Sequence, residues 1–198
     1  MIRHSGYTLI ELIVAIAIAA LLIAIAVPSF LTTVRNNRGV ADANGMLAVL
    51  TLARSEAIRR DNYVSICVST TSTPNYCASS GTWDQGYLMF VDSSACASPP
   101  SSAVSSTQLI RTEAPLSEGS TISYIVPGGS TTPTCLTFNG QGQLNSSAWV
   151  SSTTNVGYFS VLPNQSTKYS YGKRYVVLRQ IGRAVVCDPT TNTTCGTK

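Results

Sequence analysis

Few residues of this chain have side chains and neighbours suited to catalysis. Its one histidine, His4, lies next to Arg3 near the N-terminus, so no histidine cluster can hold a metal ion or supply a catalytic base. The run Gly140-Gln141-Gly142 is typical of a turn and is not part of a GxGxxG element or a P-loop. No nucleophile–base pair is apparent either. The sequence therefore predicts no enzyme, no metal site and no cofactor.

Cysteine is the other reactive residue type, and it occurs six times. No two cysteines form a CxxC pair, so a zinc site is not indicated, and an even number favours disulfides made in an oxidising compartment. Six cysteines allow fifteen pairings, among which sequence alone does not choose. Short separations make Cys67–Cys77 and Cys187–Cys195 a working hypothesis, which leaves Cys96 with Cys135.

A carboxylate at the start of an apolar run is the sharpest signal in the chain. Leu12 to Val27 is an unbroken run of 16 apolar residues, and Glu11 immediately precedes it. A helix of about 20 residues crosses a hydrocarbon core of ~30 Å. Arg3 and His4 come before the run, which places this end in the cytoplasm and everything after the span outside it. An ionised carboxylate is costly there, so Glu11 is expected to have a function.

Two simpler interpretations of this N-terminus remain open. Ala24-Ile25-Ala26 imitates the cleavage site of a conventional secretory signal, and the run can also be a plain single-pass anchor. Neither interpretation gives Glu11 a role.

The segment Gly6-Tyr7-Thr8-Leu9-Ile10-Glu11 resembles the prepilin signal of type IV pilins and type II secretion pseudopilins. This resemblance implies that a prepilin peptidase removes residues 1–6 by cleavage after Gly6 and that the new amine of Tyr7 is methylated. It also implies that residues 7–30 form a helix that spans the membrane first and enters a filament core later. Pro28 matches the proline that kinks this helix. Glu11 is then expected to neutralise the terminal amine of a neighbouring subunit, because a broken buried pair costs about 3–5 kcal/mol.

Beyond the apolar run, the sequence predicts one amphipathic helix and then strands. Over residues 32–61, apolar side chains recur at spacings of three and four, as expected for a helix with one buried stripe: Ala43, Met46, Leu47, Leu50, Ala53, Ala57 and Ile58. Residues 62–198 are β-rich, with turn residues between short runs of strand formers. The expected strands are 63–68, 86–91, 108–112, 121–126, 135–139, 156–162, 174–179 and 183–187.

These later elements resemble the GspH/FimT group of minor pilins and pseudopilins. The resemblance rests on the segment from Met46 to Ala57, on Trp83-Asp84-Gln85-Gly86 and the strand after it, on Leu136 to Gly142, and on Val176 to Arg183. It implies an α+β, pilin-like fold, in which a long N-terminal helix with a transmembrane first half packs on an antiparallel β-sheet head. Residues 31–198 are the expected periplasmic head.

Positive charge is concentrated toward the C-terminus. From Ser120 onward the sequence has six basic residues and a single acidic one, Asp188. This excess of positive charge suggests an anionic partner such as the DNA backbone. In the FimT branch a C-terminal G-R-x-R element is associated with DNA capture; here Gly182-Arg183-Ala184-Val185 lacks the second arginine. Two alternatives to DNA remain. The basic side chains can form a solvated sheet edge that deters aggregation with other strands, or their anionic partner can be an acidic pilus subunit. The candidate DNA-binding residues are Lys168, Lys173, Arg174, Arg179 and Arg183.

The expected function is that of a minor type IV pilin at or near the pilus tip. The expected partners are other minor and major pilins, the prepilin peptidase and the inner membrane, from which the subunit passes into an extracellular pilus. Two alternatives stay open: a minor pilin that binds double-stranded DNA for uptake in natural transformation, and a GspH-like minor pseudopilin of type II secretion.

Overall fold

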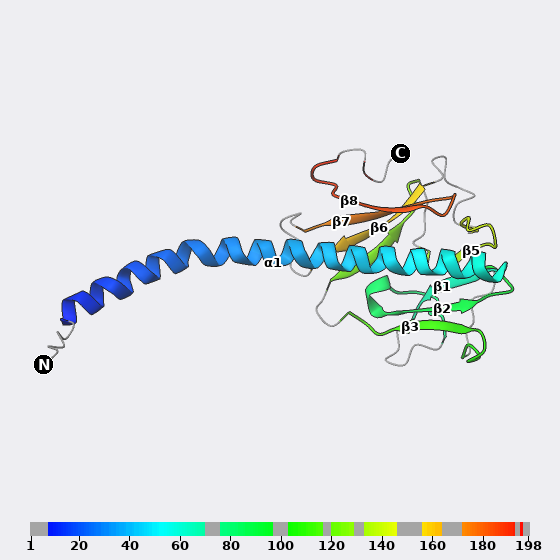
Figure 1. The fold of residues 1–198 in the computed structure, drawn as a ribbon, viewed down its shortest axis with the longest axis horizontal. Coiled ribbons are helices and arrows are strands. Elements are labelled where there is room, and N and C mark those ends of the chain that lie inside the picture. The colour runs from blue at the N-terminus through cyan, green and yellow to red at the C-terminus, as the bar shows by residue number, and fades with distance from the viewer. Residues whose placement is uncertain are drawn as a thin grey trace, which may run out of the picture.

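The computed structural model describes residues 8–69, 76–96, 103–116, 120–128, 133–145, 156–163, 172–192 and 195. Over these residues, one continuous helix, α1 (Leu9–Arg60), comes first and is followed by eight strands. The first half of α1 projects away from the head and its second half lies across the head (Figure 1). The single long N-terminal helix that the sequence predicts is therefore confirmed.

Local interactions define the C-terminal end of α1. Asp61 adopts a left-handed conformation (φ 46°) and its N–H donates to the carbonyl oxygens of Ala57 and Ile58. Arg59 and Arg60, in the last turn, suit the negative end of the helix dipole. Both arginines pair with Glu56, at 2.6 and 2.8 Å. These contacts end the helix at the point where the strands begin.

The strands form two antiparallel sheets, one on each side of α1 (Figure 1). The first has the order β3-β2-β1-β5 and the second the order β4-β6-β7-β8. Their bounds are β1 Val64–Val68, β2 Tyr87–Val91, β3 Leu109–Glu113, β4 Thr121–Ile125, β5 Cys135–Phe138, β6 Val156–Leu162, β7 Arg174–Arg179 and β8 Ala184–Cys187. All eight expected strands are confirmed to within one residue. The division into two sheets was not predicted.

The core lies between the buried stripe of α1 and both sheets. Ala43, Leu50 and Ala53 are almost fully buried, as predicted, but Ile58 is 50% exposed, so its place in the stripe was wrong. Phe159 of β6 links the two sides of the core, because its ring packs edge-on against the buried Trp83, with centroids 5.2 Å apart. Trp83 belongs to the short 3-10 helix η1 (Trp83–Gln85), which precedes β2.

A turn after β5 joins the two sheets. The Leu144 N–H donates to the carbonyl of Gln180, in the turn between β7 and β8, at 2.8 Å. Gly182 in that turn has φ 77°, and a side chain there would collide with the carbonyl oxygen of Gly142. Arg54 Nε lies against both glycines. The β7–β8 hairpin is therefore fixed beside the C-terminal half of α1.

Candidate functional site

The N-terminal half of α1 is an apolar surface without cover from the rest of the described chain. Its most apolar 18-residue window has a mean hydropathy of 3.0, and none of this window is buried against the described residues. Leu9, Leu21, Ile25 and Phe30 are each at least 65% exposed. By length and composition this segment can cross a membrane.

Glu11 has a second role that the sequence analysis missed. The Glu11 N–H donates to Thr8 Oγ1 and the Thr8 N–H donates to Glu11 Oε2, both at 3.4 Å. This reciprocal pair is a capping box, and its sequence signal was present as Thr8-Leu9-Ile10-Glu11. The box satisfies backbone donors that would otherwise be unpaired at the start of the helix. Gly6 and Tyr7, the expected cleavage site, lie outside the described residues.

The helix continues through Pro28 without a break. Proline removes one backbone hydrogen bond, and Thr32 and Thr33 both donate their hydroxyls to the Ser29 carbonyl, at 2.7 and 3.2 Å. Both features favour bending, and the projecting part of α1 is gently curved (Figure 1). A kink located at Pro28 itself stays a prediction.

The exposed segment ends where α1 meets a close backbone contact. Gly39 is buried, and a side chain on it would collide with the carbonyl oxygen of Gly172. Gly172 in turn lies against the backbone carbonyl of Arg35 and has φ 78°. These two glycines let the segment before β7 touch the helix backbone. The head therefore begins close to residue 39 of the helix.

The candidate DNA-binding residues are divided by the structure into two groups. Arg174 pairs with Asp188 at 3.0 Å, and the Lys173 ammonium lies 5.0 Å from the ring centre of Tyr175. Arg179 and Arg183 lie opposite each other across the β7–β8 hairpin, with the Arg179 N–H donating to the Arg183 carbonyl at 3.0 Å. Directly opposed residues share a face, so these two exposed side chains point the same way. Lys168 lies outside the described residues.

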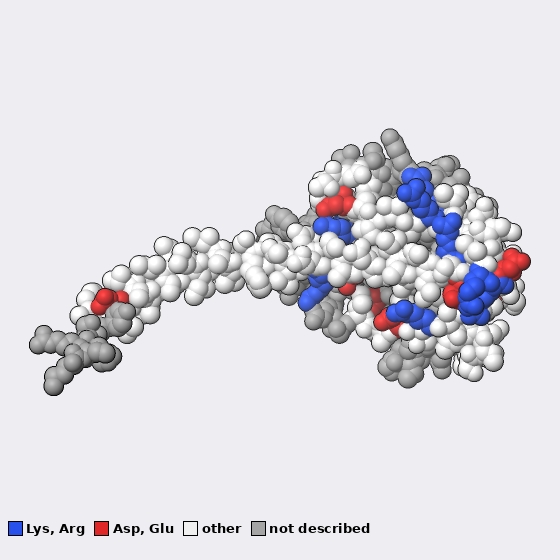
Figure 2. Space-filling view, in the orientation of Figure 1, with Lys and Arg blue, Asp and Glu red and all other residues white. Residues whose placement is uncertain are grey.

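Lys and Arg gather over the C-terminal end of α1 and the adjoining hairpin (Figure 2). Arg54, Arg59 and Arg60 belong to that end of the helix. The sequence count of basic residues toward the C-terminus missed this contribution, because the helical arginines come much earlier in the chain.

The six cysteines form three disulfides: Cys67–Cys77, Cys96–Cys135 and Cys187–Cys195. These are the pairs of the working hypothesis. Over the described ranges, no group of three or more His, Cys, Asp and Glu residues is placed to hold a metal ion.

Comparisons with known proteins bear on this arrangement. A family model described as type II transport protein GspH matches residues 42–180, and a model of the prokaryotic N-terminal methylation motif matches residues 1–27. No curated protein sequence matches the chain.

Solved structures resemble the fold. Two crystal structures of the type IV minor pilin FimU of Pseudomonas aeruginosa PAO1 align with a TM-score of 0.51, at 20% and 21% identity. These alignments cover 78% and 76% of this chain and 91% and 93% of the FimU chains. The minor pseudopilin EpsH of the Vibrio cholerae type 2 secretion system aligns with a TM-score of 0.46 and 12% identity, over 76% of this chain and 97% of EpsH. At these identities the FimU likeness shows a shared fold. Since the GspH model matches more than half of the sequence, the chain belongs to the GspH family.

Proposed function

We propose that this chain is a minor type IV pilin, a structural subunit that the inner membrane holds by α1 and that is then assembled at or near the tip of a pilus. The observation that carries the proposal is the exposed apolar half of α1, which begins within the matched N-terminal methylation motif. The FimU-like fold of the head supports the same function.

An apolar surface of this size requires an apolar environment. Burial of one Leu or Ile side chain stabilises by about 1.5–3 kcal/mol, and large apolar side chains line α1 from Leu9 to Leu31. Lipid supplies that environment before assembly, and the helices of other subunits supply it afterwards. One helix thus serves as membrane anchor and as part of a filament core.

Processing gives Glu11 its role in assembly. Cleavage after Gly6 and methylation of Tyr7 leave a positively charged amine four residues before Glu11. In the filament, Glu11 of one subunit neutralises the amine of its neighbour, and the cost of a broken buried pair, about 3–5 kcal/mol, selects one axial register. The capping box supports this role because it keeps the Glu11 carboxylate at the very start of the helix.

The head faces the periplasm in this proposal. Arg3 and His4 precede the span and hold the N-terminus in the cytoplasm. The three disulfides agree with an oxidising compartment on the other side.

Analysis of the mature N-terminus tests the processing. We expect the protein isolated from producing cells to begin at Tyr7 and to carry one added methyl group, by intact mass and N-terminal sequencing. Gly6→Leu should keep the leader, whereas Ser5→Ala should be processed normally. A mature chain that begins near Val27 would instead show a secretory signal and refute the proposal.

Substitution of Glu11 separates its charge from its capping role. Glu11→Gln retains the capping box, since glutamine can make the same backbone contact, but it removes the charge. We expect Glu11→Gln to be cleaved and membrane-held yet absent from sheared filaments. Asp61→Asn is the matched control, because it removes a carboxylate at the other end of α1, where asparagine suits the left-handed conformation. Normal incorporation of Glu11→Gln would contradict the charge-pairing role.

A minor pseudopilin of type II secretion is the alternative within the same family, whose model carries that description. Deletion of the gene decides between them. Loss of surface pili with intact protein secretion supports the pilin, and the reverse result supports the pseudopilin.

Binding of double-stranded DNA is a second candidate function, favoured by the shared face of Arg179 and Arg183 beside the basic end of α1 (Figure 2). A gel shift with duplex DNA and the full chain in detergent tests it. We expect the protein to shift the DNA band, and the shift to weaken as salt rises. The double variant Arg179→Gln, Arg183→Gln should reduce this shift far more than the control Arg35→Gln does. No salt-sensitive shift at micromolar protein would exclude this function.

A further inference from the structure

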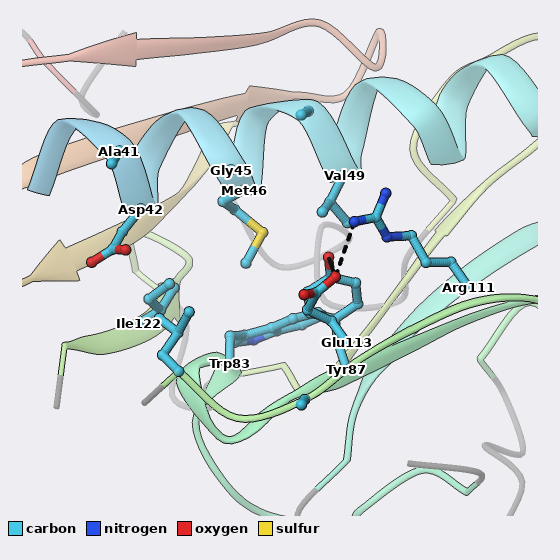
Figure 3. A pocket seen from close by; sticks show the side chains of 13 residues that line it. Ala41, Asp42, Gly45, Met46, Val49, Trp83, Tyr87, Arg111, Glu113 and Ile122 are labelled. Atoms are coloured by element: carbon cyan, nitrogen blue, oxygen red, sulfur yellow. Dashed lines mark hydrogen bonds and ion pairs between the residues drawn. The ribbon is translucent and has the colours of Figure 1, made fainter. Parts of the chain in front are cut away.

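A cleft of about 250 Å³ lies between α1 and the β2–β3 side of the head. Met46 and Val49 of α1 form one wall, and Trp83 and Ile122 lie across from them (Figure 3). Trp83 and Met46 are almost fully buried, at 3% and 4% exposure, so the floor of the cleft is a fixed part of the core.

Charged groups border this apolar floor. Asp42 accepts a hydrogen bond from Ser120 Oγ at 2.6 Å. At the end of the cleft near Val49, Glu113 pairs with Arg111 at 3.0 Å (Figure 3). Glu113 also accepts a hydrogen bond from the Tyr87 hydroxyl at 3.5 Å. Two carboxylates and one guanidinium give the lining a formal charge of −1. Among the described lining residues, the cleft is therefore an apolar slot that carries one net negative charge.

Gly45 leaves the mouth of the cleft open. It lies in the middle of α1, where glycine is less stable than alanine. Within the described part of the chain, a side chain at Gly45 would meet no atom within 4 Å, whereas Gly39 is required by its contact with Gly172. The described residues thus give no packing reason for glycine at position 45. Close approach of a group from outside the chain does.

We propose that this cleft receives a lysine or arginine side chain from a neighbouring subunit of the filament. The aliphatic stem of such a side chain packs along Met46, Val49 and Ile122, and its cation pairs with Asp42. This inference rests on the proposed function, because it requires that the chain has filament neighbours.

The dimensions of the cleft favour a side chain over a free small molecule. Its volume is below the range of about 300–1,000 Å³ typical of small-molecule sites. Its lining includes residues of α1 from Ala41 to Val49, in the half of the helix that lies across the head. A neighbour packed beside this half of α1 can reach the cleft without a change of fold.

Photo-crosslinking in producing cells tests this contact in the full chain. A benzophenone side chain replaces Ala48, an exposed residue on the rim of the cleft, and the crosslinked peptides are identified by mass spectrometry. We expect a peptide of another filament subunit, linked beside a Lys or Arg. Asp42→Asn should lower the yield about fivefold, as for a partly exposed ion pair. Gly45→Leu should abolish the crosslink by filling the mouth.

Matched controls distinguish the contact from a folding defect. Asp61→Asn and Thr51→Leu, which change exposed positions of the same helix region, should leave the yield unchanged. Gly45→Leu should unfold at a temperature no lower than the unmodified chain. A crosslinked peptide without Lys or Arg, a yield insensitive to Asp42→Asn, or links only to lipid or to the same molecule would overturn the inference.

A second probe separates this inference from the proposed function. The same benzophenone at Leu22, in the exposed apolar segment, should link to the helices of other filament subunits. If Leu22 links and Ala48 does not, the cleft inference fails alone. If neither position links to another filament subunit, the proposed function fails with it.

Discussion

Asp92 offers a sharp test of how the head is held together. Its side chain is buried and accepts four hydrogen bonds: from Ser65 Oγ, from the N–H and hydroxyl of Ser94, and from the Cys96 N–H, all at 2.7–2.8 Å. Cys96 has φ 61°, in the left-handed region that a non-glycine residue rarely occupies, and it forms a disulfide with Cys135. The Asp92 carboxylate therefore holds the loop in the conformation that this disulfide requires.

Asp92→Asn removes the charge and turns one acceptor into a donor. If the amide oxygen keeps the two bonds from Ser94, the amide nitrogen faces the Cys96 N–H, which loses its partner. A buried unsatisfied donor costs about 1–3 kcal/mol, and the remaining bonds lose their charge assistance. We expect the free energy of unfolding to fall by about 2–3 kcal/mol. Urea unfolding of the full chain in detergent, followed by tryptophan fluorescence, measures it.

The stability lost in Asp92→Asn should depend on pH. Burial raises the pKa of Asp92, but the hydrogen bonds from Ser65, Cys96 and Ser94 outweigh burial, so the pKa lies below its ordinary value of 3.8. A lowered pKa in the folded state means that the carboxylate stabilises the fold fully above the unfolded pKa. This contribution is lost as pH falls through the lower folded pKa. The difference in stability between the unmodified chain and Asp92→Asn should thus be constant at neutral pH and shrink below about pH 4.

Two results would refute this reasoning. One is that Asp92→Asn lowers the free energy of unfolding no more than Asp61→Asn does. The Asp61 carboxylate lies at the exposed helix end, so its substitution should change this free energy by less than about 0.5 kcal/mol. The other is a stability difference that stays the same down to pH 3.

Three further predictions follow from the packing. Gly39→Ala should destabilise the head by about 1–3 kcal/mol because its methyl group collides with the Gly172 carbonyl, while Gly45→Ala should stabilise it by up to about 1 kcal/mol; thermal unfolding of both variants checks this pair. Removal of the Cys96–Cys135 disulfide should lower the free energy of unfolding by about 4 kcal/mol, and removal of Cys187–Cys195 by about 2.6 kcal/mol. The first loss is larger because its cysteines are 39 positions apart in sequence, whereas those of the second are 8 apart. Urea unfolding of the two double serine variants compares these losses. Burial and the nearby Glu113 raise the pKa of Tyr87 to about 12, so its neutral form contributes stability below pH 10 that is lost as pH rises toward 12; Tyr87→Phe should remove that loss in an alkaline unfolding series.

The sequence predicted the elements well because their signals are local. The apolar run, the stripe beginning at Ala43 and the strand–turn alternation each depend on residues close together in the chain, and all were confirmed apart from Ile58. The division into two sheets depends on strand pairing, such as the contacts of β1 with β5 and of β4 with β6, which join segments far apart in sequence. No local pattern indicates such a contact.

The candidate sites divide in the same way. Glu11 could be identified from its neighbours, whereas the pairing of Arg174 with Asp188 and the opposition of Arg179 to Arg183 follow from strand register. Prediction of the cleft would have required three separate segments, those of Asp42, Trp83 and Glu113, to be placed together. Residue type and spacing could predict charge near the C-terminus but not which charges already have partners.

The continuity of α1 links the two ends of the proposed mechanism. The helix shows no break between Glu11 and Gly45, and at 1.5 Å per residue these positions lie about 50 Å apart along its path. The contact of Gly39 with Gly172 fixes the head to this rod. Any register that Glu11 selects among the apolar helices therefore also determines the height at which each head meets its neighbour. A cleft on the flank of α1 can then be selective, because only one segment of the adjoining subunit is brought opposite Asp42.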